Sequence, residues 1–110
     1  MKVSEIAQIE GFKTITLNNE NQEVLTAYTG DLLSDVIANV DEDSILITVQ
    51  AHKNTIAVCS LSSMPAIVVC NGRSCPDDMI QAAIENEISI FATEDTQFLA
   101  SVKIAKALNL

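Results

Sequence analysis

Glycine, proline and aromatic residues are scarce in this chain of 110 residues. It contains three glycines, two prolines, no tryptophan and 4% aromatic residues. Tight turns rely on glycine and proline, and an all-β sandwich needs many such turns. The composition therefore argues against a β-sandwich.

Basic residues are also few. Six lysine and arginine residues stand against 15 acidic ones, so the formal net charge is −9. Proteins that bind nucleic acids or anionic membranes present clustered basic side chains to the phosphates. We therefore expect no nucleic-acid partner and no membrane partner. The chain is still not a disordered acidic tail, because 48% of its residues are apolar.

Long apolar runs and cysteine pairs are missing as well. No run approaches the roughly 18 residues of a membrane helix, and Glu5 interrupts the N-terminus where a signal peptide would be apolar. Cys59, Cys70 and Cys75 are odd in number and form no C-x-x-C pair. We expect no disulfide framework, no metal site, no cofactor, and a cytoplasmic protein with reduced thiols. Pro76 places Cys75 beside a helix N-terminus, which favours a lowered thiol pKa.

Short apolar strands alternate with helices in the second half of the chain. Buried strands are predicted at Ser44–Gln50, Ala66–Cys70 and Ile88–Ala92, because these runs are apolar and rich in β-branched residues. The predicted helices cover Asn54–Met64, a segment with Pro76 as its first residue, and a segment capped by Thr93 whose inner stripe is Phe98, Leu99, Val102, Ala105 and Leu108.

The first half follows a related pattern. Lys13–Leu17 and Glu23–Tyr28 are predicted strands, and their antiparallel pairing would make the sheet mixed. Thr29-Gly30-Asp31 opens a helix whose stripe is Leu32, Leu33, Val36, Ile37 and Val40. Strands alternating with helices predict parallel strands joined by right-handed crossovers. The expected fold is α/β: a single domain over residues 1–110, with a mixed, mostly parallel sheet and helices on its faces.

The loops that follow the parallel strands are the predicted place for a ligand. In open α/β sheets, ligands bind beyond the carboxyl ends of these strands. The only histidine and the only arginine fall in these loops, whereas Lys2, Lys13, Lys103 and Lys106 lie elsewhere. Basic side chains and helix N-termini favour a small anionic or nucleotide ligand. The predicted ligand-binding residues are His52, Lys53, Asn54, Gly72, Arg73, Ser74, Gly30 and Thr96.

Catalytic signatures are lacking. No G-x-G-x-x-G, Walker A, G-x-S-x-G or H-E-x-x-H motif occurs, so we predict no catalytic residue and a non-catalytic module. The alternative is a phosphotransfer component or small enzyme that uses His52, because neutral imidazole is a nucleophile. No acidic residue adjoins His52 in the sequence to fix its tautomer.

Four stretches resemble the DRTGG domain family in hydrophobic pattern and loop placement: Thr29–Val36, Ile47–Asn54, Ile67–Gly72 and Ile90–Thr93. The chain looks like the stand-alone members, which are similar to the N-terminal domain of HPr kinase/phosphorylase. The Asp-Arg-Thr-Gly-Gly string that names the family is absent, and Gln50–Asn54 occupies the equivalent loop. No role of that string is therefore carried over to this chain.

The resemblance implies an α/β domain with a mixed sheet and no catalysis of its own. Such domains serve as regulatory or dimerisation modules beside partner enzymes such as phosphotransacetylases and CBS-containing pyrophosphatases. A homodimer also fits the residues, because a small sheet has exposed edges and Ile56–Met64 is apolar nearly all round.

Overall fold

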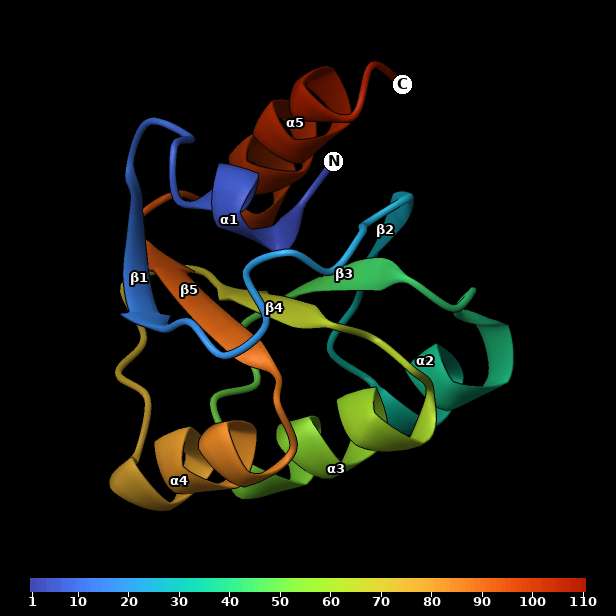
Figure 1. The fold of residues 1–110 in the computed structure, drawn as a ribbon, viewed down its shortest axis with the longest axis vertical. Helices are drawn as coiled ribbons and strands as arrows, with labels where there is room; N and C mark the ends of the chain where they lie inside the picture. The colour runs from blue at the N-terminus through green and yellow to red at the C-terminus, as the bar shows by residue number, and fades with distance from the viewer.

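The sheet at the centre of the molecule has five strands. A computed structural model describes residues 1–110. The strands are β1 (Phe12–Thr16), β2 (Thr26–Thr29), β3 (Ser44–Thr48), β4 (Ala66–Val69) and β5 (Ser89–Thr93), in the order β1-β5-β4-β3-β2 across the sheet. β2 to β5 are parallel and β1 is antiparallel to β5 (Figure 1). The predicted mixed, mostly parallel α/β fold is confirmed.

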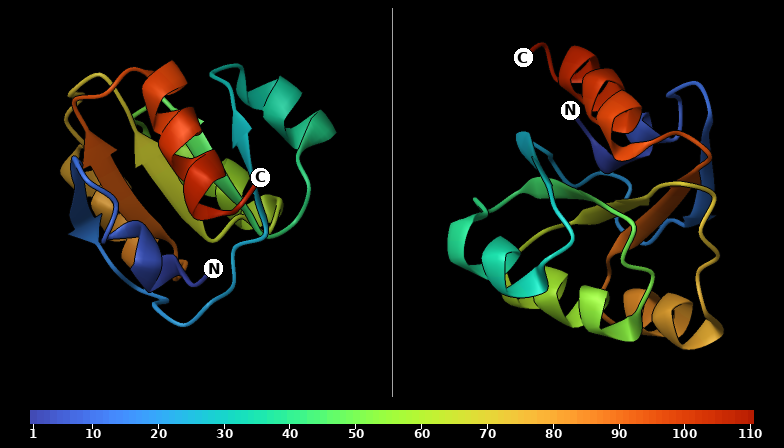
Figure 2. Two further views of the ribbon diagram at one scale, coloured as in Figure 1. Left: turned by 90° about the horizontal axis from the view of Figure 1, so that it is seen from above. Right: turned by 180° about the vertical axis from the view of Figure 1, so that it is seen from behind.

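Helices cover both faces of the sheet and make three layers (Figures 1 and 2). One face carries α1 (Val3–Ile6) and α5 (Gln97–Ala107), and the other carries α2 (Leu33–Asn39), α3 (Lys53–Leu61) and α4 (Asp77–Glu85). Each face has its own apolar core, with Phe91 in one and Ile90 in the other. None of the helices has the length and apolar character needed to cross a membrane.

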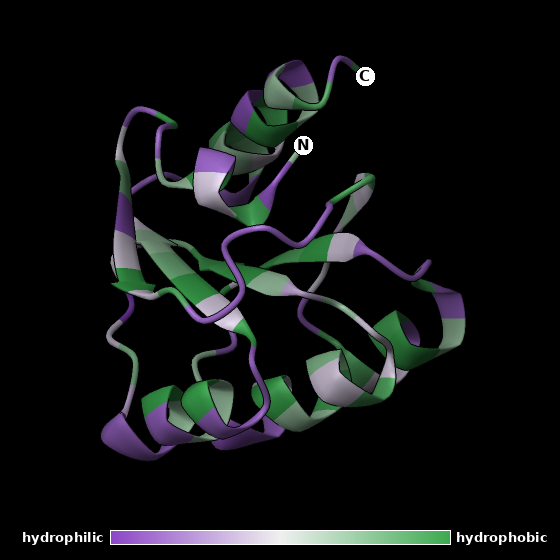
Figure 3. Cartoon of the chain, viewed as in Figure 1, coloured by the Kyte–Doolittle hydropathy of each residue, from purple (hydrophilic) through white to green (hydrophobic).

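The two cores account for the apolar runs in the sequence. Successive side chains of a strand point to opposite faces, so a strand covered on both faces is apolar throughout. All residues of β3 and β4 are buried; Ile45 and Ile47 join the core on the α5 side, and Leu46 joins the core beside α3. Figure 3 shows the hydrophobic colour along the central strands and hydrophilic colour at the loops and the helix ends.

The two N-terminal strands lie at opposite edges of the sheet. β1 pairs antiparallel with β5, and β2 pairs parallel with β3. The predicted pairing of these strands with each other is therefore wrong, although β1 does make the sheet mixed. The physical reason is that α2 connects β2 to β3 as a crossover, which requires parallel neighbours.

Three helices begin later than the sequence predicts. α2 begins at Leu33 rather than at Asp31, and Pro76 precedes α4 as its N-cap instead of being its first helical residue. Thr96, not Thr93, caps α5, because its Oγ1 accepts a hydrogen bond from the Leu99 N–H. Thr93 ends β5 and its Oγ1 accepts from the Asp95 N–H at 3.1 Å, which forms a turn before the helix.

The inner faces of α5 and α2 also differ from the predicted stripes. Phe98 and Leu99 are 79% and 43% exposed, whereas Ala100 and Ile104 are fully buried. Apolar residues lie on more than one side of α5, so periodicity alone does not select the side that packs. In α2, Val36 alone is fully buried, and the other residues of its predicted stripe are partly or largely exposed.

Candidate functional site

The carboxyl ends of the four parallel strands meet at one edge of the sheet. β1 begins at the same edge, because Phe12 pairs with Thr93 at the end of β5. The loops after β2, β3, β4 and β5 and the residues around Gly11 therefore lie along the same edge of the sheet, and the loops after β4 and β5 adjoin β1. This is the edge at which open α/β sheets bind ligands.

Asp31 joins the loops on the β2–β3 side of this edge to α5. Its Oδ1 atom accepts hydrogen bonds from Thr48 Oγ1 at 2.8 Å, from the Val49 N–H at 2.9 Å and from Gln97 Nε2 at 2.8 Å. The loop after β2 is thereby tied to β3 and to the first turn of α5. The Asp31 carboxylate makes this part of the edge unfavourable for an anion.

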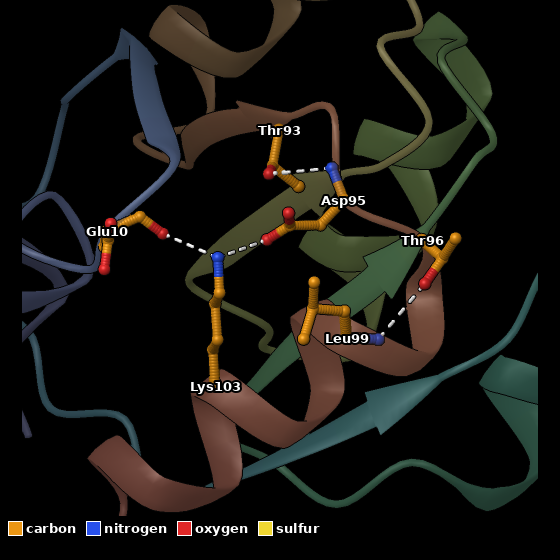
Figure 4. A network of polar contacts seen from close by, with 6 residues as sticks. All are labelled: Glu10, Thr93, Asp95, Thr96, Leu99 and Lys103. Atoms are coloured by element: carbon orange, nitrogen blue, oxygen red, sulfur yellow. Dashed lines mark hydrogen bonds and ion pairs between the residues drawn. The ribbon is translucent and has the colours of Figure 1, made fainter.

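Lys103 holds α5 against the loops near β1. Its Nζ donates to Asp95 Oδ2 at 2.7 Å and to the backbone oxygen of Glu10 at 2.9 Å (Figure 4). The two side chains of the ion pair are 24% and 17% exposed. The ammonium also lies 5.9 Å from the centre of the Phe12 ring. One lysine therefore joins α5, the loop after β5 and the loop before β1, and Asp95 balances its charge.

A hollow of about 380 Å³ lies beside this network. It is formed between the loop that leads from β4 to α4 and the edge strand β1, which run next to each other in Figures 1 and 2. The lining residues are Gly11, Lys13, Ile15, Gly72, Arg73, Ser74, Cys75, Ala92, Thr93 and Glu94. Small-molecule sites have volumes of about 300–1,000 Å³, so this hollow has room for a small ligand.

Two cations line the hollow without a partner in the chain. Lys13 and Arg73 are exposed, and the ion pairs of the structure involve other residues. The backbone N–H groups of Ser74 and Cys75 donate to no acceptor in the chain. Positive charge and free N–H donors together favour an anion. Glu94 is the only acid in the lining.

A left-handed turn positions the loop that carries Arg73. The φ angles of Asn71 and Gly72 are 61° and 64°. The Asn71 N–H donates to the backbone oxygen of Asp95 at 2.9 Å, and the Gly72 N–H donates to the backbone oxygen of Thr93 at 3.0 Å. These two bonds tie the loop to the end of β5 and the loop after it. A Cβ atom at position 72 would collide with the Glu94 carboxyl group. The Glu94 side chain is exposed and can move, so the backbone conformation is what favours glycine there.

The structure brings three of the predicted ligand-binding residues together and separates the others. Gly72, Arg73 and Ser74 line the hollow. The others lie apart from it. Three of them are at the start of α3: His52 is its N-cap, Lys53 lines a second hollow between α3 and α4, and Asn54 is exposed in its first turn. Gly30 packs against the Tyr28 ring, and Thr96 caps α5. His52 and Arg73 thus share an edge of the sheet but not a hollow.

His52 is exposed, and its imidazole takes part in neither of the ion pairs of the chain. It follows β3 directly as the residue before α3 and makes no side-chain capping bond. The structure therefore provides no group that would fix its tautomer for nucleophilic chemistry. The phosphotransfer alternative stays a prediction.

Lys13 and Glu94 are lining residues that sequence reasoning missed. Lys13 falls outside the loops after the parallel strands, but the pairing of β1 with β5 sets it opposite Ala92, beside the hollow. No signal in the sequence tells which strand β1 joins. Glu94 is the first residue after β5. It could have been found from the sequence, because it lies in a loop that follows a predicted parallel strand.

Burial raises the pKa of the three cysteine thiols. It brings the pKa of Cys59 to about 12 and, with the nearby charges of Asp95 and Asp31, that of Cys70 to about 11. The pKa of Cys75 is also raised by burial, so the predicted lowering is wrong. Cys75 packs against the core beside α3, and the loss of water outweighs any benefit from the neighbouring helix. The thiols are therefore poor nucleophiles near neutral pH.

A known structure has a similar architecture. No family model and no curated protein matches the sequence. The structure is that of the CBS and DRTGG domains of the regulatory region of Clostridium perfringens pyrophosphatase, complexed with the activator diadenosine tetraphosphate. The similarity has a TM-score of 0.75 over 97% of this chain, at 16% sequence identity. The two chains share a fold.

The predicted resemblance to DRTGG domains is thereby confirmed at the level of the fold. This chain spans 47% of the length of the pyrophosphatase chain, so it corresponds to about half of that regulatory region. The likeness covers the sheet and helices that build the hollow, because it extends over nearly all of the 110 residues.

Proposed function

We propose that this chain is a non-catalytic regulatory module that binds a small anionic or nucleotide ligand at the carboxyl edge of its sheet. The observation that carries the proposal is the hollow beside β1. Lys13 and Arg73 line it, and neither residue forms an ion pair within the chain. The chain as a whole has a net charge of −9, so two unpaired cations in one hollow give that hollow a charge opposite in sign to the rest of the molecule.

The electrostatics of the hollow favour an anion over a neutral ligand. Unpaired cations attract diffusing anions, and a bound anion relieves the repulsion between the two side chains. Ser74 and Cys75 also line the hollow, and their backbone N–H groups donate to no acceptor in the chain, so they add donors beside the two cations. The backbone hydrogen bonds of Asn71 and Gly72 to Asp95 and Thr93 anchor the start of the loop that carries these donors.

A regulatory role is supported by the protein that shares the fold. That structure comes from the regulatory region of a pyrophosphatase and contains a nucleotide activator. By analogy we propose that this chain acts beside a partner enzyme. The three free cysteines agree with a reducing, cytoplasmic location, which is part of the same proposal.

NMR chemical-shift mapping tests the site. The ¹⁵N-labelled chain is titrated separately with inorganic phosphate and with AMP. We expect saturable shifts of the amide signals of Lys13 and of residues 72–75. Arg73→Ala should weaken binding by about tenfold or more, because a charge-assisted contact is lost.

The matched control is Lys106→Ala, which removes the same charge from an exposed position in the last turn of α5. It should leave the affinity nearly unchanged. Absence of saturable shifts at residues 72–75 with either probe would contradict the proposal. Equal weakening by the two substitutions would show only a general effect of net charge.

We further propose that the module is a homodimer. The segment Ile56–Met64 buries most of its apolar side chains internally. On the β2 side of the sheet, away from the hollow, Phe98 and Leu32 are 79% and 68% exposed. The hydrogen bond from Gln97 to Asp31 joins the first turn of α5, which carries Phe98, to the loop that carries Leu32 after the edge strand β2. Apolar side chains beside an open sheet edge are suited to cover by a second copy.

Light scattering at several salt concentrations tests the homodimer. Two copies of net charge −9 repel each other, so screening by salt should strengthen the dimer. A basic partner on the same surface would instead be released by salt. Phe98→Ser should give monomers, and monomeric wild-type chain at every salt concentration would refute the dimer.

A further inference from the structure

We propose that the hollow recognises a phosphorylated sugar or polyol: Lys13 and Arg73 hold the phosphate, Glu94 accepts hydrogen bonds from hydroxyl groups, and no nucleobase is read. This inference rests on the proposed function and names the class of ligand. Three properties of the lining carry it.

The first property is the separation of charge within one hollow. Lys13 and Arg73 supply positive charge from β1 and from the loop after β4, and Glu94 supplies a carboxylate from the loop after β5. A bare phosphate or diphosphate would use the cations and be repelled by the carboxylate. A ligand with a phosphate and neutral hydroxyl groups satisfies both.

The second property is the free state of the Glu94 carboxylate. Glu94 is exposed and belongs to neither of the ion pairs, while the neighbouring Asp95 is bound by Lys103. Gly72 approaches it so closely that a side chain there would collide with its carboxyl group. A carboxylate is an acceptor only, and the hydroxyl groups of a sugar are neutral donors that form short hydrogen bonds to it.

The third property is the lack of an aromatic surface. Proteins that bind nucleobases stack them on aromatic rings or on arginine planes. None of the aromatic residues of the chain lines the hollow: Phe12 and Phe91 are buried, Tyr28 is in β2 at the opposite edge, and Phe98 is in α5. Arg73 has the one guanidinium plane in the lining, and the phosphate requires its charge.

Calorimetric titration distinguishes the ligand classes. The probes are inorganic phosphate, ribose, ribose 5-phosphate and AMP. We expect ribose 5-phosphate to bind about tenfold more tightly than phosphate, because hydrogen bonds to a charged acceptor are added. AMP should bind no more tightly than ribose 5-phosphate, and ribose alone should bind weakly.

Glu94→Gln provides the decisive variant. The substitution keeps the shape and removes the charged acceptor, so the advantage of ribose 5-phosphate over phosphate should fall several-fold while phosphate itself binds equally well or more tightly. Glu42→Gln, at an exposed residue before β3, is the matched control and should change neither affinity.

The outcomes separate this inference from the proposed function. If no probe binds, the anion site itself is refuted. If phosphate and ribose 5-phosphate bind equally, or if AMP binds more than tenfold tighter than ribose 5-phosphate, the anion site stands and the sugar phosphate assignment is overturned. An unchanged preference in Glu94→Gln also overturns it.

Discussion

Ile104→Ala tests whether α5 packs on the sheet through Ala100 and Ile104. Ile104 is fully buried and belongs to the same core as Phe12 and Phe91. The change removes three carbon atoms, worth about 2.4 kcal/mol at about 0.8 kcal/mol per buried CH₂. The cavity left behind raises the expected loss of unfolding free energy to about 3–4 kcal/mol.

Phe98→Ala is the comparison within the same helix. Phe98 is 79% exposed, so its truncation should change the free energy of unfolding by no more than about 0.5 kcal/mol. The stripe predicted from the sequence includes Phe98 but not Ile104. If α5 packed through that stripe, Phe98→Ala would lower the free energy of unfolding more than Ile104→Ala. The two variants therefore separate the packing seen in the structure from the packing that periodicity favours.

Urea unfolding followed by far-ultraviolet circular dichroism gives both values, because the chain has no tryptophan for fluorescence. The proteins are compared at a concentration at which light scattering shows the same oligomeric state. Each kcal/mol lowers Tm by about 4–8 °C in a domain of this size, so thermal scans give a second reading. A loss below about 1 kcal/mol for Ile104→Ala, together with one above about 2 kcal/mol for Phe98→Ala, would show that α5 packs through Phe98 and not through Ile104.

Three further predictions concern the site and the thiols. Gly72→Ala should lower the free energy of unfolding by about 1–2 kcal/mol in the same urea assay, because φ at this residue is 64°; an unchanged midpoint would contradict the strained turn. Asp95→Asn should cost about 1–2 kcal/mol, because Lys103 loses the partner of a largely buried pair, and a second change of Lys103→Met should then cost little more. Stability should fall as pH rises above about 9, because the unfolded Cys59 thiol ionises while the folded thiol, with a pKa of about 12, stays protonated. Cys59 alone should account for about 1.4 kcal/mol of loss between pH 8 and pH 10, and Cys59→Ala should lack that part of the slope.

The sequence was sufficient to predict the elements buried on both sides. Ser44–Thr48 and Ala66–Val69 are apolar throughout because both faces of these strands are covered, and that pattern is visible without coordinates. The helix from Lys53 to Leu61 was predictable from its length and from Pro65 after it. The alternation of these strands with helices then led to the parallel sheet.

The site was predictable only in part, because it joins segments distant in the sequence. Arg73 lies in a loop whose place follows from the end of β4, so its edge of the sheet could be predicted. Lys13 reaches the same hollow because β1 joins β5, a pairing between residues far apart that no local pattern encodes. Thr93 and Thr96 show a smaller failure of the same kind: both are good capping residues, and the side-chain bonds made in the folded chain decide between them.

The phosphate affinities of Lys13→Ala and Lys53→Ala, measured by calorimetry, show whether the anion binds beside β1 or beside α3. Both substitutions remove one lysine charge, but Lys13 lines the hollow beside β1 and Lys53 lies at the start of α3. We predict that Lys13→Ala weakens phosphate binding by about tenfold, because a charge-assisted contact is lost, while Lys53→Ala binds like the wild type. Wild-type affinity in Lys13→Ala, with weakened binding in Lys53→Ala, would contradict the account and place the anion beside His52 instead.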